Sequence, residues 1–282
     1  MPELLDGKVA IVTGAGRGLG RVMTLGLLAA GASVAATELD AEALDETGQA
    51  AEAAGTGERI LDVVADVTRD DNPPKIVRAA IERFGRLDIL VNNAGINMSL
   101  FRRPDAKPGG KFWDVTPEEF RRIIEVNVIG TFLMSRAAIP AMLKQHWGRI
   151  INVTTSLDTM YRGGMQPYGG SKAANEAHLL ALAQELEGTG VTANVLVPGG
   201  AANTRMVPTA QEPDRAKLIA PDVMVPPLLW LCSNESDGVN GQRFIGMRWD
   251  KTLRPAEAAK KAGAPAAWQQ LGRQSIRPEG MP

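Results

Sequence analysis

Residues 8–20 read Lys-Val-Ala-Ile-Val-Thr-Gly-Ala-Gly-Arg-Gly-Leu-Gly. The first six residues form a mostly apolar, β-branched run, which is typical of a strand. A glycine-dense turn follows. Arg21–Ala30 is then an apolar, helix-forming stretch that stops at Gly31, a residue suited to a helix C-cap. The segment therefore predicts a strand, a tight loop and a helix in succession.

The loop glycines are spaced G-x-x-x-G-x-G rather than as the strict G-x-G-x-x-G fingerprint. Glycines let backbone N–H groups approach a pyrophosphate, which then lies at the positive end of the following helix. We therefore expect a dinucleotide to be bound by the loop residues Gly14, Arg17, Gly18, Leu19 and Gly20. The competing interpretation is a glycine-rich turn without a ligand. The strand before the loop and the helix after it argue against that interpretation.

The rest of the chain alternates between strand-like and helix-like segments. Several strand candidates are continuous Val/Ile/Leu runs, which suits strands that are covered on both faces. The predicted strands are Val9–Thr13, Ser33–Thr37, Ile60–Ala65, Leu87–Val91, Arg149–Thr154, Thr192–Val197 and Gln242–Met247. The predicted helices are Leu19–Ala30, Asp40–Ala54, Pro74–Phe84, Pro117–Lys144, Tyr168–Gly188 and Pro221–Leu231.

Repeated strand–helix units of this kind indicate an α/β fold with a doubly wound parallel sheet and helices on both faces. We expect one domain over residues 1–250. Residues 251–282 are expected to be a C-terminal extension that packs on the same or a neighbouring subunit, anchored there by Trp268. Short helices are predicted in it at Ala256–Ala262 and Ala264–Leu271.

Composition excludes several classes of function. The 31 basic and 32 acidic residues give a net charge of -1, so neither nucleic acid nor an anionic membrane is an expected partner. No apolar stretch is expected to be long enough to span a bilayer. The single cysteine, Cys232, rules out an internal disulfide and fits a reducing, cytoplasmic location. His146 and His178 lie far apart and lack nearby cysteines, so no metal site is expected.

Tyr168 and Lys172 lie four residues apart in a predicted helix, which places both on one face. A nearby cation favours the phenolate, so we expect Lys172 to lower the pKa of Tyr168 from its usual value of about 10. A tyrosine altered in this way can transfer a proton near neutral pH. The pattern by itself also arises often by chance.

Further candidates stand where predicted strands end, the edge at which such sheets bind ligands. Glu38 lies eighteen residues after Gly20, placed to accept hydrogen bonds from an adenosine ribose and to repel a 2′-phosphate. Glu38 therefore favours NAD over NADP, whereas Arg17 would favour NADP. Asp66 and Val67 could flank an adenine. The small residues of Asn93-Ala94-Gly95 would let a cofactor lie close to the backbone.

Together these motifs resemble the short-chain dehydrogenase/reductase family. The ordered set is T-G-x-x-x-G-x-G at Thr13–Gly20, N-N-A-G at Asn92–Gly95, Asn127, a hydroxyl pair before the tyrosine, and Tyr168 with Lys172. Each motif is modest alone, but the set in this order is specific. The resemblance covers roughly Leu4 to Gly246 and implies a Rossmann fold and hydride transfer between NAD(P) and a carbonyl or carbinol carbon.

The resemblance also implies roles for individual residues. Tyr168 would be the general acid/base, and Lys172 would lower its pKa and hold the nicotinamide ribose. A hydroxyl would polarise the carbonyl: residue type favours Ser156, whereas the family's usual separation from the tyrosine favours Thr155. Asn127 would support a water-mediated proton path to the lysine. Pro198, Gly199 and Thr204 resemble the family's loop beside the nicotinamide, although Thr204 comes one residue later than usual.

The leading interpretation is thus an NAD(P)-dependent oxidoreductase that acts on a small-molecule secondary alcohol or ketone, as a homodimer or homotetramer. Two alternatives remain: a catalytically silent, dinucleotide-binding redox sensor, and an NAD-dependent epimerase or dehydratase. The natural substrate is not specified by the sequence. The basic segment Met98–Asp114 is either an anion-binding loop for the substrate or a solvated or subunit-contact loop. Its cations are Arg102, Arg103, Lys107 and Lys111.

Overall fold

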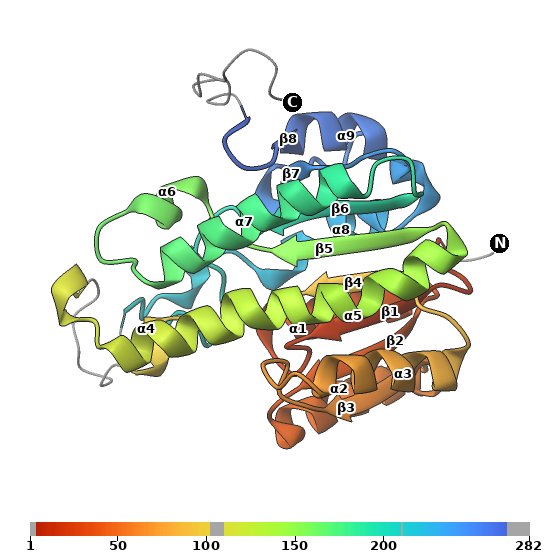
Figure 1. Ribbon diagram of the computed structural model, residues 1–282, viewed down its shortest axis with the longest axis horizontal. Coiled ribbons are helices and arrows are strands. Elements are labelled where there is room, and N and C mark those ends of the chain that lie inside the picture. Colours follow the sequence, from red (N-terminus) through yellow and green to blue (C-terminus); the bar gives the residue numbers. More distant parts are fainter. Residues whose placement is uncertain (1–3, 102–109, 210, 270–282) are drawn as a thin grey trace, which may run out of the picture.

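The computed structural model describes residues 4–101, 110–209 and 211–269. Their core is an eight-stranded sheet of order β3-β2-β1-β4-β5-β6-β7-β8 (Figure 1). All neighbouring strands are parallel except β7 and β8, which are antiparallel. The strands are β1 Val9–Thr13, β2 Ser33–Glu38, β3 Ile60–Val64, β4 Ile89–Asn92, β5 Gly148–Val153, β6 Val191–Val197, β7 Gln242–Ile245 and β8 Gly263–Pro265. The strand order reverses between β1 and β4, which confirms the predicted doubly wound sheet.

Helices cover both faces of the sheet (Figure 1). Alternate residues of one strand bury against opposite helix layers: Ala10 and Val12 join the core formed with α1 and α8, whereas Ile11 joins the core formed with α3, α5 and α7. This alternation is the two-residue period of a strand that is covered on both sides. The helices are α1 Gly18–Ala29, α2 Ala41–Ala53, α3 Asn72–Phe84, α4 Pro117–Ile124, α5 Gly130–Gln145, α6 Leu157–Tyr161, α7 Tyr168–Glu185, α8 Val225–Leu231 and α9 Pro255–Ala262.

The helix predicted for Pro117–Lys144 forms, but a π-helical turn, η4 (Glu125–Ile129), separates α4 from α5. Such a turn inserts one residue and rotates the side chains that follow it. The expectation that no apolar stretch is long enough to span a bilayer was wrong, since Pro117–Gln145 has sufficient length and apolar composition. This helix is also a core element, because Met134, Ala138 and Met142 of α5 are buried against the sheet.

The C-terminal extension belongs to the same sheet. The predicted helix Ala256–Ala262 is confirmed as α9. The helix predicted for Ala264–Leu271 is wrong: Gly263–Pro265 forms β8, which pairs with β7. Pairing satisfies the free N–H and C=O groups of the β7 edge, and Pro265, which has no N–H, is tolerated on an edge strand. Ala266 and Ala267 are the buried residues that follow, whereas Trp268 is half-buried.

Candidate active site

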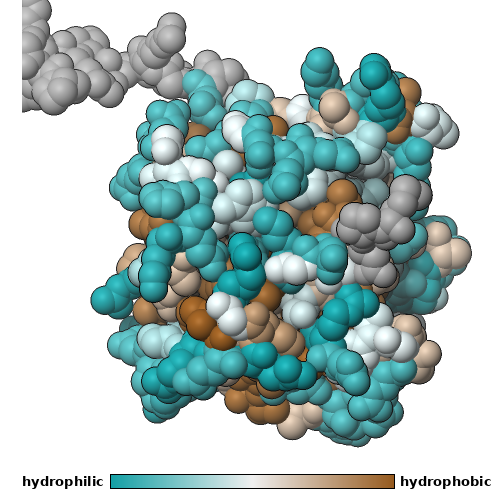
Figure 2. Space-filling model, turned by 90° about the vertical axis from the view of Figure 1, so that its right-hand side faces the viewer, coloured by the Kyte–Doolittle hydropathy of each residue, from teal (hydrophilic) through white to brown (hydrophobic). Residues whose placement is uncertain are grey.

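A cavity of about 430 Å³ lies where the parallel strands end. Its wall includes the residues just after several strands, among them Gly14 after β1, Asn93 after β4, Thr154 after β5 and Pro198 after β6. The opposite side of the molecule, where the strands begin, is mostly hydrophilic, with scattered small groups of apolar residues (Figure 2). The cavity is therefore at the edge that open α/β sheets use for ligands.

The glycine loop is shaped by close backbone contacts. Gly14 and Gly18 have φ values of +65° and +53°, a region that favours glycine. A Cβ on Gly20 would lie 1.9 Å from the Gly14 carbonyl oxygen. Arg17, the N-cap residue of α1, makes no side-chain hydrogen bond to the first turn of the helix, which contains no acidic residue. The first N–H groups of α1 are thus without a side-chain acceptor at the cavity wall, as a pyrophosphate site requires.

The adenosine side of the cavity contains Glu38, which accepts hydrogen bonds from the N–H of Gly16 (3.2 Å) and of Leu39 (2.8 Å). Arg17, which the sequence left as a competing phosphate ligand, forms an ion pair with Asp40 at 2.7 Å. That ion pair and the hydrogen bond from the Ala43 N–H hold the pKa of Asp40 below its usual range, the Ala43 contribution being the larger. Arg17 therefore already has an anionic partner within the protein.

The other predicted cofactor residues also line this cavity: Asp66, Val67, Asn93, Ala94 and Gly95. Asn93 connects two strand ends, because its side-chain amide donates to the carbonyls of Thr13 and Gly14 at 2.9 and 3.0 Å. The N–H groups of Asn93 and Ala94 each donate to the Thr13 hydroxyl at 3.0 Å. These bonds fix the N-N-A-G turn against the glycine loop.

Tyr168 is the first residue of α7, and Lys172 lies one turn later. Both side chains are buried, and both residues line the cavity. The Lys172 ammonium donates to the Val153 carbonyl at 2.9 Å and lies 5.9 Å from the centroid of the Tyr168 ring. The sequence motif thus brings the two groups together in the cavity wall, as predicted.

The pKa of Tyr168 differs from the value that the sequence predicted. Burial raises the pKa of Tyr168 to about 12, and a hydrogen bond with Thr155 opposes this. Burial lowers the pKa of Lys172 to about 8. The prediction that Lys172 lowers the tyrosine pKa below its usual value was therefore wrong for the protein's own groups. Desolvation of the phenolate dominates, because the ammonium is directed to a backbone carbonyl.

The two candidate hydroxyls have different surroundings. Thr155 lines the same cavity as Tyr168, and its hydroxyl lowers the pKa of the Tyr168 phenol against the effect of burial. Ser156 is the N-cap residue of α6, its hydroxyl lies 2.7 Å from that of Thr159, and it is not part of the cavity lining. Of the two candidate hydroxyls, Thr155 is therefore the one that shares the cavity with the tyrosine, whereas residue type favoured Ser156.

Asn127 lies in η4 and is fully buried behind the cavity wall. Its side-chain oxygen accepts from the Ile96 N–H (2.8 Å), and its amide donates to the Ile96 carbonyl (2.9 Å) and the Ser171 hydroxyl (2.9 Å). Its main-chain carbonyl accepts from Asn175 and Thr131. Asn127 thus connects the turn after β4 to α7.

The loop after β6 forms the remaining wall. Pro198 and Thr204 line the cavity, and a Cβ on Gly18 would lie 2.9 Å from the Thr204 methyl group. Gly199 is not part of the lining: its φ is +107°, and a Cβ there would lie 2.8 Å from the Ile245 side chain. Gly199 therefore allows close packing on β7.

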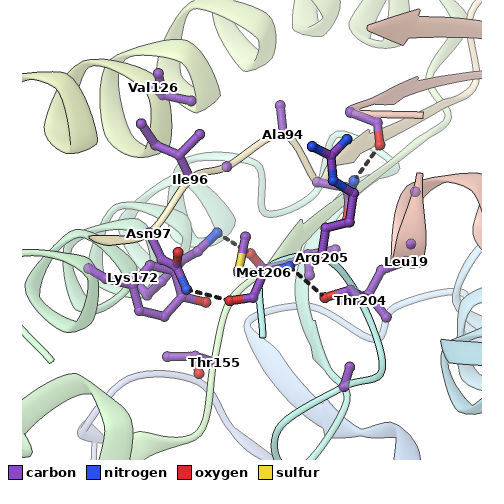
Figure 3. A pocket seen from close by; sticks show the side chains of 18 of the residues that line it. Leu19, Ala94, Ile96, Asn97, Val126, Thr155, Lys172, Thr204, Arg205 and Met206 are labelled. Atoms are coloured by element: carbon purple, nitrogen blue, oxygen red, sulfur yellow. Dashed lines mark hydrogen bonds between the residues drawn. The ribbon is translucent and has the colours of Figure 1, made fainter. Parts of the chain in front are cut away.

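The loop after β6 also brings residues to the cavity that were not predicted from the sequence. Thr155 and Lys172 lie on one side of the cavity, and Leu19 and Thr204 lie on the other (Figure 3). The Asn97 amide donates to the Met206 carbonyl at 3.0 Å, which connects the loops after β4 and β6 (Figure 3). The missed lining residues include Arg122, Thr159, Arg162, Met165, Arg205 and Met206. The available signal was position after a strand, which applies to residues 200–207 and also to Leu39, Ala65, Ile96 and Asn97.

The basic segment Met98–Asp114 is described only at its ends, by the 3₁₀ turns η2 (Met98–Leu100) and η3 (Phe112–Asp114). Arg102, Arg103 and Lys107 lie outside the described residues, so their anion hypothesis stays a prediction. The Lys111 ammonium lies 5.9 Å from the Trp113 ring centroid. Among the residues that the structure describes, no three His, Cys, Asp or Glu side chains form a group that could hold a metal ion.

Comparison with known proteins agrees with this geometry. The family model described as short chain dehydrogenase matches residues 8–215. The BbsD subunit of a hydroxy(phenyl)methyl-succinyl-CoA dehydrogenase from Thauera aromatica is 34% identical over 247 residues, covering 84% of this chain and 94% of the relative. A 3-oxoacyl-(acyl-carrier-protein) reductase from Thermotoga maritima is 32% identical over 251 residues, covering 84% and 95%.

Solved structures give the same result. The structure of a 3-ketoacyl-(acyl-carrier-protein) reductase from Brucella melitensis in complex with NADH matches with a TM-score of 0.73 and 31% identity, over 84% of this chain and 95% of the other. These findings confirm the predicted fold and the predicted oxidoreductase class. The chain belongs to the short-chain dehydrogenase/reductase family.

Proposed function

We propose that this protein is an NAD-dependent oxidoreductase that interconverts a secondary alcohol and a ketone, with Tyr168 as general acid/base. The observation that carries the proposal is one shared cavity. Tyr168, Lys172 and Thr155 line the same cavity as the glycine loop and Glu38. A nucleotide held by the loop would therefore reach the group that transfers a proton.

Tyr168, Thr155 and Lys172 each have a separate role in the proposed reaction. With a pKa raised to about 12, Tyr168 is protonated at neutral pH and can donate its proton to the oxygen of a carbonyl that is being reduced. Thr155 lies in the same cavity wall and can donate its one hydroxyl hydrogen to the same carbonyl oxygen. Lys172, with a pKa of about 8, is mostly charged at neutral pH and places an ammonium in the cavity wall, where it would hold the nicotinamide ribose.

The cavity fits a nicotinamide dinucleotide. The first turn of α1 would hold the pyrophosphate, Glu38 the adenosine ribose, and Asp66 and Val67 the adenine. When bound, the nicotinamide supplies the hydride acceptor or donor and, when oxidised, a positive charge that favours the phenolate. We propose NAD rather than NADP because Glu38 lies at the ribose position and Arg17 is paired with Asp40.

Three apolar residues of the cavity wall, Ile96, Met165 and Met206, pack in the cluster that contains Tyr168. Relatives are named for aryl- and acyl-thioester substrates and for a fluorenol. We propose a hydrophobic alcohol or ketone as the substrate class. Exposed Phe120, Ile129 and Phe132 on the α4–α5 helix support a homodimer or homotetramer, and the single buried cysteine supports a reducing, cytoplasmic location.

The test is a panel of secondary alcohols, ketones and 3-oxoacyl thioesters, assayed with both cofactors. The variants are Tyr168→Phe and, as a matched control, Tyr161→Phe, which alters the other tyrosine, an exposed one outside the cavity lining. We expect Tyr168→Phe to lose turnover by about a hundredfold or more while its NADH affinity stays within about twofold. Equal turnover by Tyr168→Phe would remove the tyrosine from the mechanism. Tight NADH binding by wild type without turnover of any substrate would favour the redox-sensor alternative.

A further inference from the structure

A buried ion pair lies directly behind the cavity wall. Arg243 of β7 donates to Glu176 of α7 at 2.6 Å, and both side chains are almost completely buried. Neither residue lines the cavity. Sixty-seven positions separate them in the chain, so no local sequence pattern indicates the contact.

The pair holds the end of β5. The Thr154 hydroxyl donates to the Glu176 carboxylate at 3.0 Å, and Arg243 donates to the Thr155 carbonyl at 2.6 Å. Lys172 donates to the carbonyl of Val153, two residues earlier. Two cations therefore fix the backbone on either side of Thr154, immediately beside the Thr155 hydroxyl in the cavity wall.

The second oxygen of Glu176 accepts the N–H of Ala267 at 3.1 Å. Ala267 has a φ of +55°, an uncommon conformation for a residue with a Cβ. The preceding residue, Ala266, donates to the Gly241 carbonyl at 2.9 Å. The residues after β8 thus complete the hydrogen bonding of a carboxylate that would otherwise lack a partner for one oxygen.

A buried ion pair adds little net stability compared with apolar residues of similar volume, because its charges lose their hydration. A contribution to fold stability therefore does not explain why a charged pair lies here. The fixed geometry of its hydrogen bonds does. A guanidinium offers several donors in a fixed plane and can hold a carboxylate and a backbone carbonyl together.

We infer that Glu176 and Arg243 are positioning residues for the active site: they hold the Thr155 backbone so that its hydroxyl stays in the cavity wall beside Tyr168. This inference deepens the proposed function and rests on it for the link to catalysis. The placement of Thr155 beside Tyr168 can be tested without any substrate, because the chain contains only two tyrosines.

The experiment uses the full-length protein labelled with ¹³Cζ-tyrosine. The carbon spectrum contains one resonance from Tyr168 and one from Tyr161, assigned with Tyr161→Phe. The test variant, Glu176→Leu with Arg243→Met, replaces the pair by apolar side chains and is expected to fold. The control, Arg149→Met with Asp237→Asn, removes an ion pair between a buried arginine and an exposed carboxylate, at the opposite end of β5.

We expect the test variant to shift the Tyr168 resonance and leave that of Tyr161 in place, and the control to shift neither. With an active substrate, the test variant should lower kcat by about tenfold or more with an NAD KM within about twofold, since small displacements of orienting groups reduce the rate of the chemical step. Arg243→Lys keeps the charge but not the planar fork, so it should shift the same resonance if the double variant does not fold. An unmoved Tyr168 resonance in a folded test variant overturns the inference, whether or not a substrate has been found.

Discussion

Lys172 carries a charge in a buried position, and this has a measurable effect on stability. Burial lowers its pKa from about 10.5 to about 8. At neutral pH Lys172 is therefore charged in the folded protein, although its charged form is less favourable there than in the unfolded chain. Between pH 8 and pH 10.5 the unfolded state binds more protons than the folded state, so the free energy of unfolding rises with pH.

The magnitude follows from the two pKa values. For a single group of this kind, the gain between pH 7 and pH 10 is roughly 2.5 kcal/mol, nearly all of it above pH 8. The comparison is with Lys172→Met, which has no titrating group at this position. Loss of the hydrogen bond to Val153 changes the stability of that variant by an amount that depends little on pH. Subtraction also cancels the opposite contribution of Tyr168, whose raised pKa reduces stability above about pH 10.

The assay is urea unfolding followed by tryptophan fluorescence at pH 7, 8, 9 and 10 and at a fixed protein concentration. We expect the wild type to gain about 2–3 kcal/mol relative to Lys172→Met across this range. The control is Lys144→Met, an exposed lysine on α5, whose difference from the wild type should stay flat. A difference for Lys172→Met that changes by less than about 1 kcal/mol would refute the assignment of a desolvated ammonium.

Three further predictions follow from the site. Thr155→Ala should lower kcat by about tenfold or more, whereas Ser156→Ala should stay within about threefold, because Thr155 lines the cavity with the tyrosine and Ser156 does not. Steady-state kinetics compare the two variants, and the reverse ranking would contradict this geometry. Glu38→Ala should raise the NADP-to-NAD ratio of kcat/KM by about tenfold, since a carboxylate repels the 2′-phosphate; an unchanged ratio would reject its role. Gly20→Ala should unfold at a clearly lower temperature and lose NADH binding, because its Cβ would lie 1.9 Å from a carbonyl oxygen. Gly163→Ala is the control, since a Cβ at Gly163 would lie in open space. Thermal melts and fluorescence titration should show that this control behaves as wild type.

The order of elements was readable from the sequence because it depends on local chemistry. Alternating apolar runs and helix formers gave seven of the eight strands, and glycine spacing placed the first loop. β8 was missed because the alanines on both sides of it favour a helix, although Gly263 and Pro265 do not, and because its pairing depends on an edge that only the folded sheet presents. Tertiary context overrode local preference there.

The family, the glycine loop and the pairing of Tyr168 with Lys172 were determined by the sequence alone, since each depends on residue type at short, fixed spacing. The tertiary structure decided which of the two candidate hydroxyls lines the cavity with the tyrosine, that Arg17 is paired with Asp40, and that burial raises the phenol pKa. It also brought Glu176 to Arg243. These properties depend on side-chain direction and on exclusion of water, which arise from contacts between distant segments and leave no local pattern in the chain.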